Sequence, residues 1–377
     1  MRKNPLVTAA TAMTARAANA PADARADAGG VPSLDPAALE ASIAGPPSPA
    51  VTGAILKVTG SAGNWQGVSG VRDVRTNAPV PSNGRFRIGA VTRIFTAVVV
   101  LRLVGEGLVG LDEPVQRYVP GLLPGSYPEI TVRRLLDHTS GLPQPGEPGD
   151  GDAERFAADR LDSRTMRELV ADAVRRPMAA EPGTVQRGNP LGYWLAGVLI
   201  EQVTGHAYPV EATRRILRPL RLADTLAPDP RDPRLPGPHA NGYVAVQEDG
   251  RTVLHDVSRQ SPWSAADGGL ISTAPDLTRF MLALFRGRVV PRPQLDEMFR
   301  VPDVPSDGGN RFGLGLTRVT GPNGVVAWGQ HGSLPGFTTG LLATRDLSRV
   351  VVYSLNTTGR SSASEYVEAI TAAAFGA

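Results

Sequence analysis

The stretch FRIGAVTRIFTAVVVLRLVGEGLVGLDEPV, from Phe86 to Val115, carries the strongest structural signal in this chain of 377 residues. It opens with a short extended run and passes directly into a segment predicted as a helix from Ala90 to Gly105. Apolar residues occupy nearly every position of that segment, on all of its faces, so the helix is predicted to be buried. We therefore expect the fold to be built around this helix.

Segments on both sides of this helix have the alternation and turn punctuation of β-strands. The predicted strands are residues 53–60, 64–73, 324–332, 338–346 and 349–358. Strands at both ends of the chain, with helices between them, indicate one sheet assembled from distant segments. The fold class is therefore α/β (α+β). An antiparallel sheet from residues 50–89 and 310–360 is flanked by helices, with an all-helical domain inserted at about 110–270 and a closing helix at 362–375.

Capping residues mark two further helices. Asp35 before Pro36 predicts a helix through Ile43, because proline is favoured at the first helical position. Asn189 before Pro190 predicts another helix, which ends at Gly205.

Composition excludes several classes of protein. The net charge is only +3 and the basic residues are scattered among acids, so no nucleic-acid partner is expected. The absence of cysteine excludes disulfides and thiolate chemistry. The five histidines show no metal-ligand spacing, so neither a metal nor a cofactor is expected; they are His138, His206, His239, His255 and His331. No run approaches the ~18 apolar residues of a membrane span.

Residues 1–32 are predicted to be a disordered tail or a signal peptide, ahead of one domain over residues 33–377. Basic residues precede a weak apolar stretch at 6–15, and small-residue cleavage patterns follow at 18–20 and 22–24. We therefore expect a secreted or extracytoplasmic protein. A cytoplasmic protein with an alanine-rich tail is the alternative.

Several blocks together resemble one known family, from about Leu39 to the C-terminus. These blocks are residues 86–121, 130–143, 192–205, 216–225, 268–284, 311–316 and 328–337. The chain is similar to the serine β-lactamase and D-alanyl-D-alanine carboxypeptidase superfamily, in its class C-like branch. The resemblance implies a cleft between the sheet and the helical domain. It also implies three motifs that converge there: Ser-x-x-Lys, Tyr-x-Asn (or Ser-x-Asn), and Lys- or His-x-Gly.

The first of these motifs has neither of its reactive side chains in this sequence. Its positions hold Ala90 and Arg93, so a methyl group stands where the resemblance implies a serine nucleophile. Arginine stays protonated at any working pH and cannot accept the proton that a lysine of lowered pKa can accept. No Ser-x-x-Lys occurs elsewhere, because Lys57 is the only lysine beyond Lys3 and position 54 is alanine.

The second motif has two possible alignments. It reads either Gly188-Asn189-Pro190 or, after a slip of one residue, Arg187-Gly188-Asn189. Neither alignment supplies a phenol. Asn189 is thus either an amide partner for a ligand or a plain helix cap.

The third motif is also open to two alignments. It reads Gln330-His331-Gly332, or His331-Gly332-Ser333 after a slip. Adjacent strand residues point to opposite faces, so only one of Gln330 and His331 can direct its side chain to the cleft. We favour Gln330.

Backbone groups of the family's oxyanion hole survive any change of side chain. They would be the N–H groups of Ala90 and Ser333. With Arg93 nearby, the site is predicted to receive a carboxylate or a polarised carbonyl. The predicted ligand-binding residues are Ala90, Arg93, Asn189, Gln330, Gly332 and Ser333. Arg93 could instead fill the lysine's volume and pair with a scaffold acid.

Other candidate groups have simpler structural explanations. Asp137-His138 lies in a scaffold block. Asp267 is the best candidate acid, although a turn before Gly268 also accounts for it.

Three functions remain open, and the first is preferred. It is a non-hydrolytic pseudoenzyme that binds a small molecule or peptide, as a monomer. The second is a repurposed enzyme of secondary metabolism that carries out a cyclisation, isomerisation or transfer without a covalent intermediate. The third is a residual serine hydrolase or esterase with Ser264 or Ser333 as its nucleophile.

Overall fold

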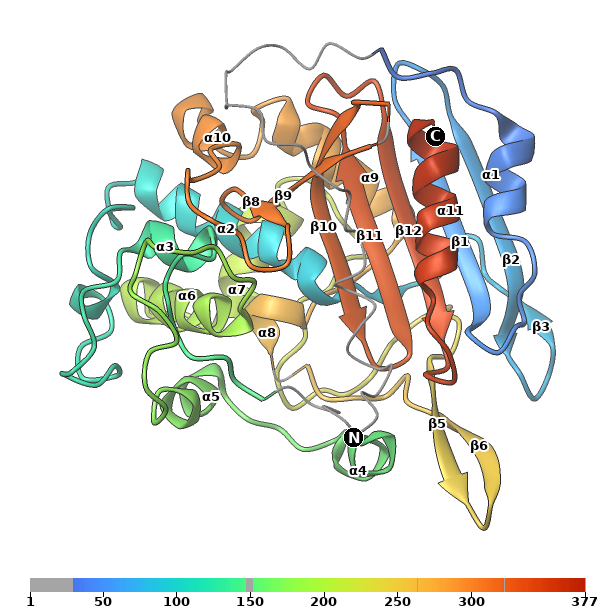
Figure 1. Ribbon diagram of the computed structural model, residues 1–377, viewed down its shortest axis with the longest axis horizontal. Coiled ribbons are helices and arrows are strands. Elements are labelled where there is room, and N and C mark those ends of the chain that lie inside the picture. Colours follow the sequence, from blue (N-terminus) through green and yellow to red (C-terminus); the bar gives the residue numbers. More distant parts are fainter. Residues whose placement is uncertain (1–29, 147–151, 263, 322, 377) are drawn as a thin grey trace.

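The protein is described by a computed structural model, which covers residues 30–146, 152–262, 264–321 and 323–376. Its centre is an antiparallel sheet of eight strands in the order β3-β2-β1-β12-β11-β10-β9-β8 (Figure 1). The strands are β1 (Val51–Thr59), β2 (Trp65–Asp73), β3 (Ala78–Pro79), β8 (Arg311–Phe312), β9 (Thr317–Thr320), β10 (Val326–Leu334), β11 (Phe337–Ala343) and β12 (Val350–Thr357). The first and last strands of the chain are therefore neighbours, with Ala54 opposite Leu355. This arrangement confirms the predicted fold class.

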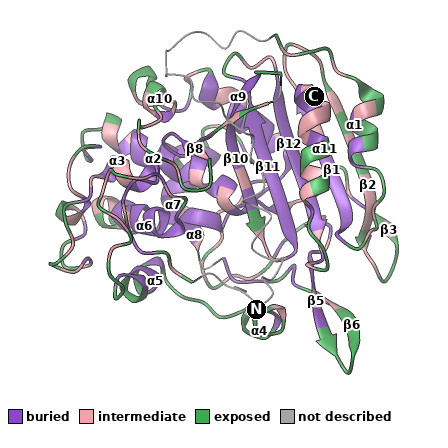
Figure 2. Ribbon diagram, in the orientation of Figure 1, coloured by how far each residue is buried: buried purple, intermediate pink, exposed green. Residues whose placement is uncertain are grey.

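Helices cover both faces of the sheet. One face packs against α1 (Pro36–Ser42) and α11 (Ser364–Phe375), and the other against α2 (Thr92–Gly105) and α9 (Ala274–Phe285) (Figure 1). The α2 helix is almost entirely buried, as its continuous apolar sequence predicts (Figure 2). It also stacks on α9 through Phe95 and Phe280, whose ring centroids lie 3.8 Å apart. The predicted cap of α1 is present, since Asp35 accepts hydrogen bonds from the first turn.

The inserted segment lies beside the sheet and contains mostly helices. They are α3 (Val132–Leu136), α4 (Ala153–Asp159), α5 (Met166–Ala173), α6 (Pro190–Thr204), α7 (Tyr208–Ala212) and α8 (Ala265–Gly268); α10 (Arg292–Met298) follows α9. The α6 helix is the core of this region. It begins at its cap, Asn189, and ends at Gly205, which takes the left-handed conformation.

The segment also contains a β-hairpin, formed by β5 (Tyr243–Glu248) and β6 (Arg251–Asp256), that the sequence analysis did not predict. Its turn residues Asp249 and Gly250 have φ values of 47° and 76°, as the tight turns of two-residue hairpins require. The hairpin projects from the body of the molecule (Figure 1). Close by, β4 (Phe86–Arg87) pairs with β7 (Ile271–Ser272) instead of joining the large sheet.

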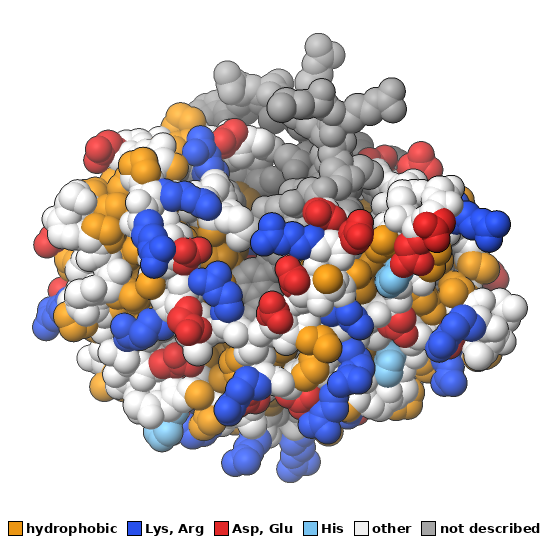
Figure 3. All heavy atoms as spheres, turned by 90° about the horizontal axis from the view of Figure 1, so that it is seen from below, with side chains coloured by type: hydrophobic (Ala, Val, Ile, Leu, Met, Phe, Trp, Pro, Cys, Tyr) orange, Lys and Arg blue, Asp and Glu red, His pale blue; other side chains and the backbone are white. Residues whose placement is uncertain are grey.

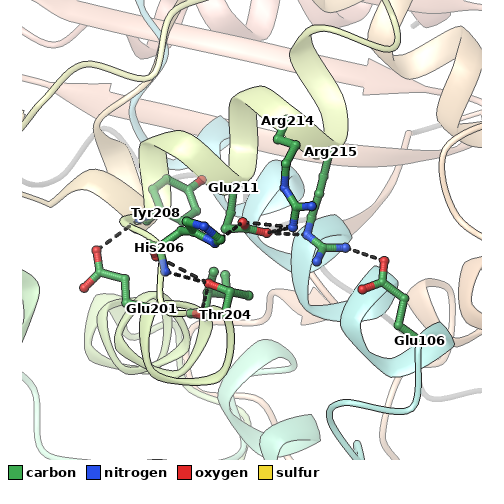
Figure 4. A network of polar contacts seen from close by, with 9 residues as sticks. Glu106, Glu201, Thr204, His206, Tyr208, Glu211, Arg214 and Arg215 are labelled. Atoms are coloured by element: carbon green, nitrogen blue, oxygen red, sulfur yellow. Dashed lines mark hydrogen bonds and ion pairs between the residues drawn. The ribbon is translucent and has the colours of Figure 1, made fainter.

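An ionic network centred on a buried carboxylate joins the helical region to the end of α2 (Figure 4). The carboxylate of Glu211 is fully buried and accepts hydrogen bonds from Arg214 and Arg215. Arg215 also pairs with Glu106, which caps the end of α2. Burial by itself would raise the pKa of Glu211, but these two guanidinium groups hold it below its ordinary value.

The predicted tail lies almost wholly outside the described residues, which begin at Gly30. Among the helices of the described part of the chain, none is long and apolar enough to cross a membrane.

Candidate functional site

The cleft forms where the start of α2 crosses β10. A single turn of 3₁₀ helix, Gly89–Val91, precedes α2 and passes very close to the strand. A Cβ atom at Gly89 would lie 2.9 Å from the amide nitrogen of Ser333, and one at Gly332 would lie 2.1 Å from the carbonyl oxygen of Ile88. Only glycine fits either position, and the contact brings Ala90 beside the strand that carries Ser333.

A cavity of about 800 Å³ opens at this crossing, between the sheet and the inserted segment. The predicted residues that line it are Ala90, Arg93, Gly188, Ser264, Asp267, Gln330, His331 and Ser333. Phe156, Trp194 and Val244 add an apolar wall. The molecule's lower face shows basic and acidic side chains interspersed, without a continuous basic stripe (Figure 3).

Arg93 and Asp267 form an ion pair in the wall of this cavity. The Nε of Arg93 lies 2.6 Å from Oδ1 of Asp267, and the two side chains are only 13% and 12% exposed. The guanidinium also lies over the ring of Tyr193, 5.4 Å from its centroid. Burial raises the pKa of Asp267, while the charge and hydrogen bond of Arg93 oppose that rise. The charge of Arg93 is thus already matched by a carboxylate of the protein.

Asn189 acts as a structural residue here. Its Oδ1 accepts from the backbone of Leu191 at 2.9 Å, and its Nδ2 donates to the carbonyl oxygens of Leu142 and Pro143. It is 3% exposed and is absent from the cavity wall. Its backbone N–H donates to Nδ1 of His138, at 3.1 Å. The amide thus caps α6 and ties down a loop through bonds made within the protein.

His138 is a buried scaffold residue. Burial lowers its pKa well below the ordinary value, and the nearby charge of Arg93 acts in the same direction. The imidazole is therefore neutral, in agreement with the Nδ1 acceptor role toward Asn189.

Gln330 and His331 both border the cavity but differ in their contacts. The carboxamide of Gln330 donates to the carbonyl oxygen of Gly315 at 3.3 Å. The ring of His331 instead lies 2.6 Å from the hydroxyl of Tyr353, which packs in the core beneath α11. The two side chains therefore take opposite faces of β10, as strand alternation predicts. Gly332 faces the backbone of Ile88 and is absent from the cavity wall.

Asp267 was named from the sequence, and an acid partner for Arg93 was offered as an alternative, but the two residues were not joined. Arg87, which lines the cavity, was not predicted, and neither was the pairing of Arg187, a residue of the slipped second motif, with Asp307. No local signal joins such pairs, since Arg93 and Asp267 are 174 residues apart in the chain. Among the described residues, no group of His, Cys, Asp or Glu could hold a metal ion.

The Beta-lactamase family model matches residues 7–375 of this chain. The chain belongs to the β-lactamase family. This confirms the resemblance to the serine β-lactamase and transpeptidase superfamily.

Individual relatives carry different activities in their names. The chain is 24% identical to penicillin-binding protein 4* of Bacillus subtilis, over 81% of this chain and 67% of that protein. It is 32% identical to esterase EstB of Burkholderia gladioli, over 42% of this chain and only 43% of the esterase.

Two solved structures match over nearly their whole length. A D-stereospecific amidohydrolase from Streptomyces sp. superposes with a TM-score of 0.79 at 30% identity, covering 90% of this chain and 98% of that one. A D-amino acid amidase from Ochrobactrum anthropi, complexed with D-phenylalanine, gives a TM-score of 0.74 at 26% identity, over 89% and 98% of the two chains.

Proposed function

We propose that the cleft binds a small molecule or peptide without forming an acyl-enzyme, as a non-hydrolytic member of the β-lactamase family. The observation that carries the proposal is the pair at the start of α2. Ala90 offers only a methyl group to the cavity, and Arg93 is bonded to Asp267. A nucleophile and a proton acceptor are both missing from the two positions that the Ser-x-x-Lys motif would fill.

Two other serines of the cavity could in principle replace the missing nucleophile. Ser264 and Ser333 line the cavity, yet within the described residues no imidazole or carboxylate forms a hydrogen bond to either hydroxyl. A serine hydroxyl without such a partner is a weak nucleophile. This supports binding over residual hydrolysis.

Binding remains compatible with the backbone of the cleft. The amide groups of Ala90 and Ser333 lie at the crossing of α2 and β10, where they would polarise a carbonyl oxygen. The named relatives include an amidohydrolase, an amidase and an esterase, so an amide or ester carbonyl is the group that we propose for this position.

A repurposed enzyme is the second candidate, and one observation favours it. Asp267 is a carboxylate in the cavity wall whose pKa is raised by burial, which is typical of catalytic acids and bases. In that case Asp267 would move a proton on a bound ligand without covalent attachment.

Two further expectations belong to this proposal. We propose that the protein is exported and acts as a monomer, although a penicillin-binding protein homologue from Pyrococcus abyssi is octameric. Light scattering of the purified protein tests the monomer, and N-terminal sequencing of protein recovered from the producing cells tests the cleavage expected within residues 18–24.

A fluorescent penicillin tests the main proposal. We expect no labelled band after denaturing electrophoresis and no mass increase of the intact protein, with no hydrolysis of a chromogenic cephalosporin above buffer. Thermal-shift measurements with intact β-lactams and acyl-D-alanyl peptides should at the same time show reversible stabilisation. A stable adduct on any serine would overturn the proposal.

A further inference from the structure

Among the described residues of the cavity wall, one cation has no carboxylate within ion-pair distance. Three arginines and two aspartates line it: Arg87, Arg93, Arg187, Asp267 and Asp307. Arg93 pairs with Asp267 at 2.6 Å, and Arg187 pairs with Asp307 at 2.8 Å. Within the described residues, no carboxylate lies within 4.0 Å of the guanidinium of Arg87.

Arg87 is also deeply buried. Its residue is 2% exposed, and it donates from Nε to the carbonyl oxygen of Ser258 at 3.1 Å and from Nη2 to that of Pro233 at 2.6 Å. Burial lowers its pKa to about 10, so it stays protonated at neutral pH. The charge of Asp232 acts on this pKa in the opposite direction, and that carboxylate is itself bonded to Arg234 at 2.7 Å.

Removing a cation from water costs free energy, and bonds to neutral carbonyl groups alone leave most of that cost uncompensated. An anionic ligand group in the same cavity would offset that cost. The backbone of Arg87 is held firmly enough to serve as a receptor, because it pairs with Ile271 and its carbonyl oxygen accepts from Thr339.

We infer that Arg87 receives an anionic group of the ligand and is the residue that sets a preference of the cavity for carboxylates over their neutral analogues. This inference rests on the proposed function, since it names the ligand class of the same cleft. The apolar wall of Phe156, Trp194 and Val244 suits an aromatic or aliphatic body attached to that carboxylate.

A matched pair of probes tests the inference on the unmodified protein. Hippurate carries a phenyl ring, an amide and a carboxylate, and hippuramide replaces the carboxylate with an uncharged amide of the same shape. We expect hippurate to bind at least ten-fold more tightly in a calorimetric titration, as a charge-assisted hydrogen bond implies. Equal binding of both probes, or of neither, overturns the inference.

Variants then assign the preference to one arginine. Arg87→Gln should abolish the preference for hippurate, and Arg87→Lys should keep part of it. The control Arg187→Gln removes a cavity cation that is already paired, so it should leave the preference unchanged. If the preference persists in Arg87→Gln, the inference is overturned in favour of Arg93.

If Arg87→Gln does not fold, the comparison of hippurate and hippuramide on the parent protein still tests whether the cavity prefers a carboxylate. Failure of the inference is also distinct from failure of the proposed function. Binding without a preference for the carboxylate contradicts only the role of Arg87, whereas an acyl adduct contradicts the non-covalent cleft.

Discussion

The Nε of Arg93 lies 2.6 Å from Oδ1 of Asp267 and joins the first turn of α2 to the short helix α8. Neither side chain is more than 13% exposed, so each charge depends on the other in a poorly solvated place. Arg93 therefore contributes to the structure of the cleft as well as to its charge.

Removing Arg93 should therefore destabilise the protein by more than the loss of a surface ion pair would. In Arg93→Ala we expect a loss of about 3 kcal/mol in the free energy of unfolding, because the Asp267 carboxylate is left buried and unpaired. The double variant Arg93→Ala with Asp267→Ala should recover part of this loss. Urea unfolding of the parent, both single variants and the double variant measures the coupling. If the losses of unfolding free energy in the two single variants add up to the loss in the double variant, the pair is energetically unimportant.

Rebuilding the first motif should not restore a hydrolase. In Ala90→Ser with Arg93→Lys, the new ammonium group would face Asp267, and neither the second nor the third motif would be repaired. Members of a catalytic unit act non-additively, so half a unit should give at most slow acylation. Fluorescent penicillin labelling over hours measures it, with Ala90→Ser alone as the matched control. Efficient turnover of a chromogenic cephalosporin by the double variant would contradict our assignment of the other two motifs.

Gly332 should be intolerant of any side chain. A methyl group there would lie 2.1 Å from the carbonyl oxygen of Ile88 and 2.9 Å from the amide nitrogen of Ala90. We expect Gly332→Ala to cost about 2 kcal/mol or more, since β10 must move away from the start of α2. Gly125→Ala is the matched control, because a Cβ atom at Gly125 would contact nothing within 4 Å. Thermal unfolding of the two variants should therefore differ clearly.

His331 should make the folded state sensitive to mild acid. Burial lowers its pKa to about 4 from an ordinary value of 6.5, so the unfolded chain binds its proton more readily. The contribution of neutral His331 to the free energy of unfolding is fully present above pH 6.5 and falls as the pH is lowered toward 4. His331→Phe should flatten this part of the stability curve without abolishing the slope, because His138 shifts in the same direction. Parallel curves for the parent and the variant, measured by urea unfolding between pH 7.5 and 4.5, would contradict this assignment.

The fold could be predicted from the sequence because its signals are local and repeated. Asp35, Asn189 and Gly205 mark helix ends by capping chemistry that operates within a few residues. The β5–β6 hairpin was missed although its Asp249-Gly250 turn carries a standard signal. Its second strand, β6, is mostly exposed, so the sequence there lacks the regular alternation of apolar residues that indicates a strand.

Less of the site could be predicted from the sequence, because its contacts join distant segments. Ala90 and Arg93 could be named from the sequence, but the partner of Arg93 comes from α8. For Asn189 the residue could be named from the sequence, but its role could not. Its position suits either a cap or a ligand contact, and only the bonds to Leu142 and Pro143 show that its amide is already occupied.

The strand order also constrains how the chain can be made. β1 lies between β2 and β12, and its register joins Val51 to Thr357 across nearly the whole sequence. During synthesis, β1 can therefore pair only with β2 until the last strands of the chain emerge. The helical segment can meanwhile collapse locally. Contacts of such long sequence separation slow folding and leave sheet edges exposed. The cleft, whose strand wall is β10, is consequently among the last parts of the molecule to be assembled, and a chain that ends before β12 would lack the strand that joins the β10–β11 hairpin to β1.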